Sequence, residues 1–173
     1  MKIGIAVERS LEVPAPYEQV RMLLHDLEGT IRRFPKLRSL KKLGDLDYLS
    51  EMNPMGAHAL GISHRVSYAA RYAVDPGKGR LSWEPLPRHG NALISGNFQI
   101  KKAGTGTQMV FGVRGELDKV PVPFMYRLLA PAFIQGKFTR LVDVFLEQTR
   151  TALLTMPAPR KAPARKRSIG KKK

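Results

Sequence analysis

The sequence has no cysteine among its 173 residues. This absence excludes a disulfide framework, a thiolate zinc site, an iron–sulfur cluster and a cysteine nucleophile. A long apolar run is also missing, because the most apolar window, residues 120–134, contains one arginine and three prolines, whereas a bilayer-spanning helix needs about 20 apolar residues. Residues 1–13 lack the continuous apolar region of a signal peptide. We therefore expect a cytoplasmic protein that is at most peripheral to a membrane.

Acidic residues are scarce, since 14 Asp and Glu stand against 30 Lys and Arg and give a net charge of +16. Eight of the basic residues and no acid lie in residues 157–173, which leaves +8 for residues 1–156. Such an excess indicates an anionic partner, either nucleic acid or an acidic membrane surface. The last segment also consists mainly of Pro, Ala, Lys and Arg. We expect one folded domain over residues 1–156 and a disordered basic tail over residues 157–173.

Motifs of enzyme and metal chemistry are missing as well. The four histidines, His25, His58, His64 and His89, do not have the spacing of metal ligands. The chain contains neither a Gly-x-Ser-x-Gly elbow nor a phosphate-binding loop, and no acidic pair suggests acid–base catalysis. We predict no metal, no cofactor and no catalytic residue, and enzyme activity has no support from these residues.

The first third of the chain predicts a strand followed by two short helices. Residues 2–13 alternate apolar and polar with period two. Arg9 is the one exception, and we expect it to lie at the sheet rim or to mark a bulge. Pro16 suits the first turn of a helix. Gly29 is expected to end that helix, and a short second helix should end near Phe34-Pro35, because the residue before proline avoids the helical region.

The middle of the chain predicts about six further strands. We expect two strands within residues 36–52, a loop at residues 53–56 and one strand over residues 62–74. Another loop should occupy residues 85–90. The remaining three strands alternate apolar and polar over residues 80–85, 91–100 and 107–118. Short turns make consecutive strands antiparallel, and one apolar face per strand indicates a sheet covered on one side.

The cover is expected to be a long helix over residues 123–154, bent in its first third by Pro131 and Gly136. Its apolar residues fall on one helical stripe, which consists of Phe138, Leu141, Val142, Phe145, Leu146 and Leu153. The predicted fold class is α+β: a curved antiparallel sheet of about six to seven strands wraps around a long C-terminal helix, and two short helices follow the first strand.

Several local sequences in this order resemble the START-like superfamily, which is also called SRPBCC or helix-grip. The segments that carry the resemblance are Val13-Pro14-Ala15-Pro16 with Glu18-Gln19-Val20, Phe34-Pro35, Leu81-Ser82-Trp83, the hairpin of residues 96–100 and 107–111, and the final helix. The resemblance covers residues 1–154 and indicates no single subfamily. Birch-pollen-allergen-like proteins, polyketide cyclase/dehydrase-type domains and coenzyme Q-binding proteins share this fold.

The resemblance implies a cavity between sheet and helix that holds a small hydrophobic ligand such as a lipid, a quinone or a polyketide. Aromatic and apolar side chains on the inner faces of the predicted elements are the candidate lining: Tyr68, Tyr72, Trp83, Phe98, Met109, Phe111, Phe138, Leu141 and Phe145. His64 shares a strand face with Tyr68, so it is a further candidate or else a core or rim histidine. The same residues would equally fill a solid core.

Two loops are candidate gates of such a cavity, residues 85–90 and the proline-broken segment 120–134. In the second, Phe124, Met125 and Leu128 are the candidate portal residues, which would touch a membrane or would pack in a core or dimer interface. For docking to an anionic surface, the candidates are Arg32, Arg33, Lys36, Arg165, Lys166 and Arg167. A solvated basic face is the alternative for the first three.

Three functions are therefore open. In the first, the domain binds and could also transport a hydrophobic ligand, and its basic tail brings it to an anionic surface. The second is an enzyme of polyketide cyclase or hydratase type, in which His64, Tyr68 or Tyr72 would position a substrate. The third is association with nucleic acid through the tail, although the chain has no nucleic-acid-reading motif.

Overall fold

The structure is a computed structural model, and it describes residues 1–57 and 62–157. Seven antiparallel strands form one curved sheet in the order β1-β9-β8-β7-β6-β3-β2. The strands are β1 (Ile3–Val13), β2 (Leu37–Lys42), β3 (Asp47–Met52), β6 (Ser67–Asp75), β7 (Arg80–Gly90), β8 (Ala92–Ala103) and β9 (Gly106–Leu117). A separate antiparallel pair consists of β4 (Met55–Ala57) and β5 (Ile62–His64).

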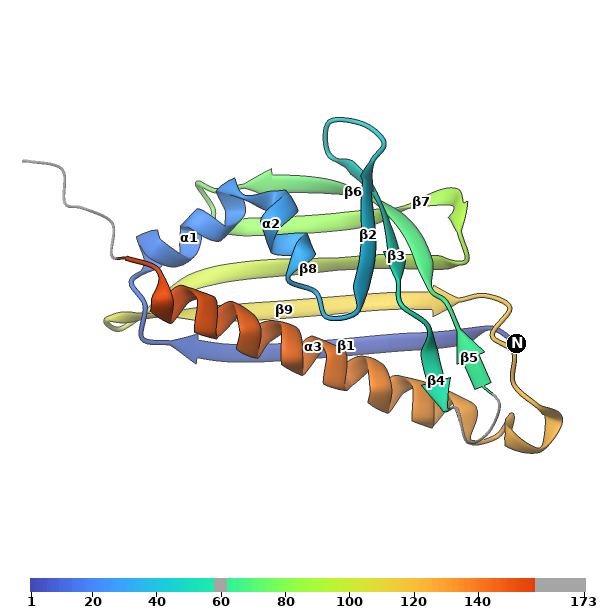
Figure 1. Cartoon of the computed structure of the whole chain (residues 1–173). Helices are drawn as coiled ribbons and strands as arrows, with labels where there is room; N and C mark the ends of the chain where they lie inside the picture. Colours follow the sequence, from blue (N-terminus) through green and yellow to red (C-terminus); the bar gives the residue numbers. More distant parts are fainter. Residues whose placement is uncertain (58–61, 158–173) are drawn as a thin grey trace, which may run out of the picture.

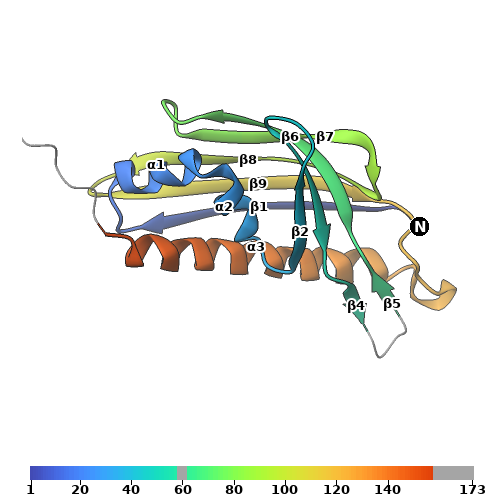
Figure 2. The ribbon, with the colours of Figure 1, turned by 45° about the horizontal axis from the view of Figure 1, so that its top comes forward.

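Three α-helices lie on the concave side of the sheet (Figures 1 and 2). They are α1 (Tyr17–His25), α2 (Leu27–Arg32) and the 26-residue α3 (Ala130–Thr155). A short 3-10 turn, η2 (Phe124–Tyr126), precedes α3. The predicted helix-grip architecture is confirmed, because the long C-terminal helix runs along β1 and β9 while the sheet curls around it. Among the described residues, no helix is long and apolar enough to cross a membrane.

The core lies between α3 and the sheet. The apolar positions of β1, β8 and β9 face inward and are buried, as period two requires. The buried stripe of α3 consists of Ala130, Val142, Phe145, Leu146, Thr149 and Leu153. At its C-terminal end, Gln19 Nε2 of α1 donates to the Leu153 carbonyl at 2.6 Å, which among the described residues otherwise accepts only from the Met156 amide at 3.3 Å, so that α1 helps to satisfy the last carbonyls of the helix.

The start of α3 is attached to the edge strand β1. The Gln135 side chain exchanges two hydrogen bonds with the backbone of Ala6, at 3.0 and 2.8 Å. Arg9 Nε donates to Asp143 Oδ1 at 2.7 Å. Arg9 pairs with Phe111 of β9 without a register shift, so of the two predicted places for this residue the sheet rim is right and the bulge is wrong.

Five predicted boundaries differ from the structure, two of them in the helices. The break between α1 and α2 is at Asp26, whose carboxylate accepts from the Gly29 amide at 2.9 Å, and Gly29 lies inside α2. α3 begins at Ala130 and continues through Gly136. Pro131 therefore lies in its first turn, where a missing N–H costs no hydrogen bond, and it starts the helix instead of bending it.

The other three differences concern strands. Residues 53–56 are not all loop, since β4 begins at Met55, and residues 62–74 form two strands, β5 and β6, instead of one. Residues 85–90 continue β7 and are not a loop. β8 pairs with β7 only at residues 80–83, so beyond Trp83 one side of β7 is free of a partner. Proline is tolerated in a strand at such a free edge, which explains Pro85 and Pro87 in β7.

Candidate functional site

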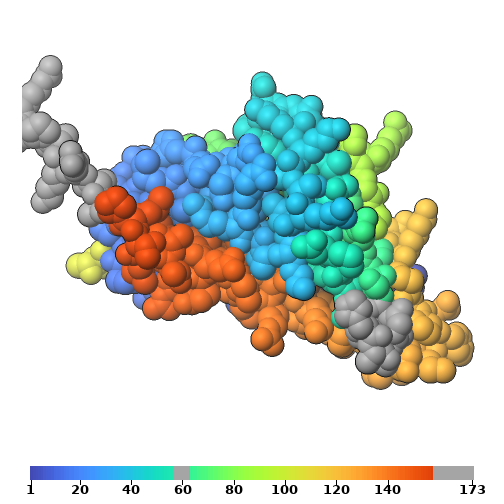
Figure 3. All heavy atoms as spheres, in the orientation of Figure 1, coloured from blue at the N-terminus to red at the C-terminus, as the bar shows by residue number. Residues whose placement is uncertain are grey.

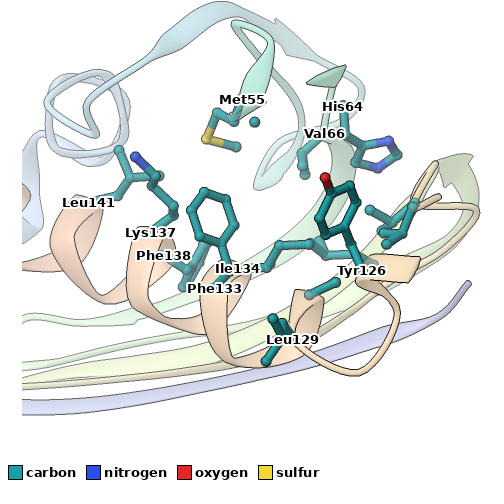
Figure 4. Close-up of a pocket in the computed structure, with 15 residues that line it drawn as sticks. Met55, His64, Val66, Tyr126, Leu129, Phe133, Ile134, Lys137, Phe138 and Leu141 are labelled. Atoms are coloured by element: carbon teal, nitrogen blue, oxygen red, sulfur yellow. The ribbon is translucent and has the colours of Figure 1, made fainter. Parts of the chain in front are cut away.

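Two apolar cavities lie between α3 and the sheet. The outer cavity, of about 250 Å³, is surrounded by the first turns of α3, the segment that leads into them and the β4–β5 pair. Figure 4 shows side chains of α3 facing Met55, Val66 and His64 across it. The inner cavity, of about 70 Å³, lies deeper against β6, β7, β8 and β9. Met55, Val66 and Phe138 line both cavities, which therefore adjoin each other at these side chains.

Aromatic side chains form a continuous belt around the inner cavity. Tyr72 stacks on Trp83 with ring centroids 6.0 Å apart, and Trp83 contacts Phe111 at 5.7 Å. Phe111 in turn contacts Phe145 of α3 at 5.4 Å, and Phe145 contacts Phe34 at 5.6 Å. These rings come from three strands, α3 and the segment after α2, so the belt links the sheet to its helical cover.

The candidate lining residues are divided between the two cavities. The inner cavity is lined by Tyr68, Tyr72, Trp83, Phe98, Phe111, Phe138 and Phe145. The outer cavity is lined by His64, Phe138 and Leu141. Met109 is fully buried and lines neither of them. The candidate gate at residues 85–90 is part of β7 and contributes no side chain to either lining.

Several lining residues were missed by the sequence analysis. Met55 lies in a segment that was assigned to a loop, so its inward direction could not be recognised. Val66 shares the predicted strand face of His64 and Tyr68 and could have been selected with them. Tyr126 and Ile134 lie in the apolar window 120–134 and line the outer cavity. Their place in this apolar window was a usable signal, but which of its side chains face the cavity depends on the start of α3 at Ala130, which leaves Tyr126 in η2.

Polar groups are few in the outer cavity. The His64 Nε2 and the Asn91 Nδ2 are 3.5 Å apart, and burial lowers the pKa of His64, with a smaller contribution from the positive N-terminus. The imidazole is therefore mainly neutral at pH 7. Lys137 Nζ lies 5.4 Å from the centre of the Phe133 ring, an arrangement in which the ring face attracts the ammonium group. Within residues 1–57 and 62–157, no group of three or more acidic or histidine side chains could hold a metal ion.

The segment that leads into α3 forms an exposed apolar tip, which we define as residues 124–129. The side chains of Phe124, Met125 and Leu128 are 85, 76 and 90% exposed. In Figure 3 the tip projects from the end of the molecule where α3 starts. Tyr126 and Leu129 of the same segment line the outer cavity. The three candidate portal residues therefore lie beside the outer cavity but point away from it, while their neighbours form part of its wall.

The three candidate docking residues that the structure describes lie in α2 and in the segment that follows it. Arg32 pairs with Glu28 at 2.7 Å and Arg33 donates to the Thr30 hydroxyl at 3.2 Å, both within and just after α2. Lys36 follows in the turn before β2, with a positive φ of 65°. The other three candidates, Arg165, Lys166 and Arg167, lie outside the described residues, as do residues 158–173 of the predicted tail and His58.

No protein-family model matches the sequence, and no curated protein matches it. Solved structures do match. The Zhui aromatase/cyclase from Streptomyces sp. R1128 superimposes with a TM-score of 0.61 at 13% identity, covering 87% of this chain and 94% of its own. DR_A0006 from Deinococcus radiodurans has a TM-score of 0.58 at 23% identity over 87% of this chain and 99% of its own. Ara h 8.0201 has a TM-score of 0.58 at 11% identity over 88% and 99%. At these identities the likeness shows a shared fold.

Proposed function

We propose that this protein, which has the START-like helix-grip fold, binds a small hydrophobic ligand between α3 and the sheet. The observation that carries the proposal is the outer cavity of about 250 Å³ with its almost entirely apolar lining. An apolar cavity of about 150 Å³ in another protein stays dry and binds benzene. The outer cavity is larger, so a ring system or a short chain is a suitable occupant, and its burial removes apolar surface from water.

The ligand enters, in this proposal, past the tip. Tyr126 and Leu129 form part of the cavity wall, so a shift of the segment before α3 would open the cavity without unfolding the helix. The prolines at positions 121, 123 and 131 limit regular hydrogen bonding there. The exposed apolar side chains of the tip would enter a membrane, from which an apolar ligand could pass directly to the cavity. Residues 157–173, with eight basic side chains, would hold the protein at an anionic surface.

Filling the outer cavity should prevent binding. Ile134 lies on α3 and lines the outer cavity, so Ile134→Trp places a large ring in the space that the ligand needs. We expect equilibrium dialysis to show at least a tenfold weaker binding of naphthalene, which corresponds to about 1.4 kcal/mol. Val144→Trp is the matched control, because Val144 is 37% exposed and lines neither cavity. Equal binding by both variants, or no binding by the unmodified protein, would contradict the proposal.

A second candidate is a cyclase-type enzyme. It is favoured by His64, a largely neutral imidazole at the outer cavity, and by the Tyr68 and Tyr72 side chains in the inner cavity. A neutral imidazole can accept a proton, and a tyrosine can donate a hydrogen bond to a carbonyl oxygen. The enzyme would be supported if the protein turned over a β-keto thioester and His64→Gln lost this turnover while it still bound naphthalene. If the unmodified protein showed no turnover, ligand binding would remain as the function.

A further inference from the structure

Three hydroxyl-bearing side chains lie together at the inner cavity, and two of them, Tyr68 and Tyr72, belong to its lining. Ser50 of β3 is directly opposite Tyr68 of β6 in the sheet. Tyr72 lies four residues further along β6 and therefore shares the inward face with Tyr68. Ser50 is completely buried and Tyr72 is 6% exposed. We call Ser50, Tyr68 and Tyr72 the hydroxyl trio.

The trio is incompletely hydrogen-bonded. Ser50 Oγ has no hydrogen-bond partner of good geometry among the described residues, although it lies beside the Tyr68 hydroxyl. The groups that act on the Tyr68 hydroxyl are those of Ser50 and Tyr72, neither of which is charged. Each hydroxyl has one donor and two acceptor positions, so the trio retains hydrogen-bonding capacity in a buried place. Buried polar groups of this kind are normally satisfied by protein, water or ligand.

Tyr68 and Tyr72 direct this capacity to the cavity, because both line it. The cavity lining contains no carboxylate, ammonium or guanidinium group, and the Thr30 hydroxyl of its lining already donates to the Leu23 carbonyl at 2.8 Å. Burial raises the pKa of both tyrosines, and their mutual contact raises that of Tyr72 further. Both hydroxyls therefore keep their protons at neutral pH and remain able to donate.

We propose that the hydroxyl trio binds the uncharged oxygen of a ligand, either a carbonyl or a hydroxyl, whose apolar body occupies the cavities. The inference rests on the proposed function and specifies the class of ligand. A carboxylate at the same position would be buried without a compensating cation, which is strongly unfavourable. The site therefore selects neutral, mainly apolar molecules that carry one oxygen at the end that lies in the inner cavity. It discriminates against fatty-acid-like anions.

Three probes with one ring system test this selection: naphthalene, 2-naphthol and 2-naphthoate, each measured by equilibrium dialysis at pH 7 with the full chain. One neutral hydrogen bond predicts that 2-naphthol binds about two- to tenfold more tightly than naphthalene, and we expect 2-naphthoate to bind least. Tyr68→Phe and Tyr72→Phe should each reduce the preference for 2-naphthol and leave the affinity for naphthalene unchanged. Tyr126→Phe, which alters a hydroxyl side chain of the outer cavity, is the matched control and should keep the preference.

The outcomes separate this inference from the proposed function. If none of the three probes binds, the proposed function itself is wrong. If naphthalene binds but 2-naphthol has no advantage, or keeps its advantage in both tyrosine variants, the inference is overturned and hydrophobic binding stands. Tightest binding of 2-naphthoate, lost in Lys137→Gln, would also overturn it, because the ligand's polar end would then lie at the outer cavity, which Lys137 lines.

Discussion

Single residues show how this fold accommodates departures from simple alternation. Arg9 interrupts the apolar face of β1, yet it keeps its register with Phe111 and reaches Asp143 on α3 at 2.7 Å. The two side chains are 41 and 50% exposed, and an exposed ion pair contributes only about 0–1 kcal/mol. With the Gln135–Ala6 hydrogen bonds, the pair orients α3 on the edge strand instead of adding much stability. A charged residue at an inward position thus marks where the helix crosses that edge.

Gly96 is a residue whose missing side chain is required by a neighbour. It is opposite Trp83 in the β7–β8 pair, and a Cβ at this position would lie 2.3 Å from Trp83 Cζ2 and 2.4 Å from the Gly112 carbonyl oxygen. Gly96→Ala must therefore move the indole ring that lines the inner cavity. We expect a loss of about 1–3 kcal/mol in the free energy of unfolding, measured by urea denaturation with the fluorescence of the single tryptophan.

Gly4→Ala is the control for this substitution, because a Cβ at Gly4 would have no atom within 4 Å. Its free energy of unfolding should change by less than about 1 kcal/mol. Equal stability of the Gly96→Ala and Gly4→Ala variants would show that Trp83 is not confined by Gly96.

At the scale of elements, the sequence predicted those parts whose periodicity is local. The strands β1, β8 and β9 and the apolar stripe of α3 follow from period two and period 3.6. The division into β5 and β6, the strand character of residues 85–90 and the start of α3 depend on pairing partners that lie far away in the chain. Prolines suggested a loop at residues 85–90, but the missing β8 partner beyond Trp83 permits them in a strand.

The candidate site divides in the same way. Inward-facing aromatic residues such as Tyr72 and Phe111 could be selected from strand alternation alone. The hydroxyl trio could not be, because Ser50 is brought beside Tyr68 only by the β3–β6 pairing. Whether inward-facing side chains enclose a cavity or fill a core depends on packing between α3 and the sheet, which a single sequence pattern does not encode.

The tip before α3 carries a prediction at the scale of one element. Phe124 is 85% exposed, and burying such a side chain contributes about 1.5–3 kcal/mol. If the tip enters a bilayer, Phe124→Asp should weaken cosedimentation with phosphatidylglycerol-containing vesicles by about tenfold or more. Binding of naphthalene from buffer should not change, because Phe124 lines neither cavity.

Leu154→Asp provides the matched control for the tip. Leu154 is also an exposed apolar residue, at 54%, but it lies near the C-terminal end of α3. Vesicle binding should survive this substitution. The same loss in both variants would indicate a nonspecific effect of added negative charge, and unchanged binding of Phe124→Asp would mean that the tip does not enter the membrane.

For the whole molecule, the net charge of +16 has two separate origins: residues 1–156 carry +8, and residues 157–173, the predicted tail, carry +8. The tip lies at the start of α3, whereas the tail begins beyond its end (Figure 1). A helix of 26 residues is about 39 Å long. The 16 residues after Pro157 can span at most about 55 Å when extended. Even with α3 perpendicular to a membrane, the tail is long enough to reach the surface that the tip would enter.

Deleting residues 157–173 should therefore weaken vesicle binding in a manner that depends on salt. Each Lys or Arg near an anionic surface contributes about 1 kcal/mol, and the attraction falls off within about 8 Å at 0.15 M salt. We expect the full chain to cosediment with phosphatidylglycerol-containing vesicles at least about tenfold better than the truncated chain at low salt, and equally at high salt. A full-length variant with the eight basic residues replaced by glutamine should behave like the truncated chain, because charge and not length is required.

The loss in Phe124→Asp should instead persist at high salt, since it removes apolar burial. Equal binding of the full and truncated chains at low salt would contradict membrane docking by the tail, and displacement of the full chain from vesicles by duplex DNA would favour nucleic acid as its partner.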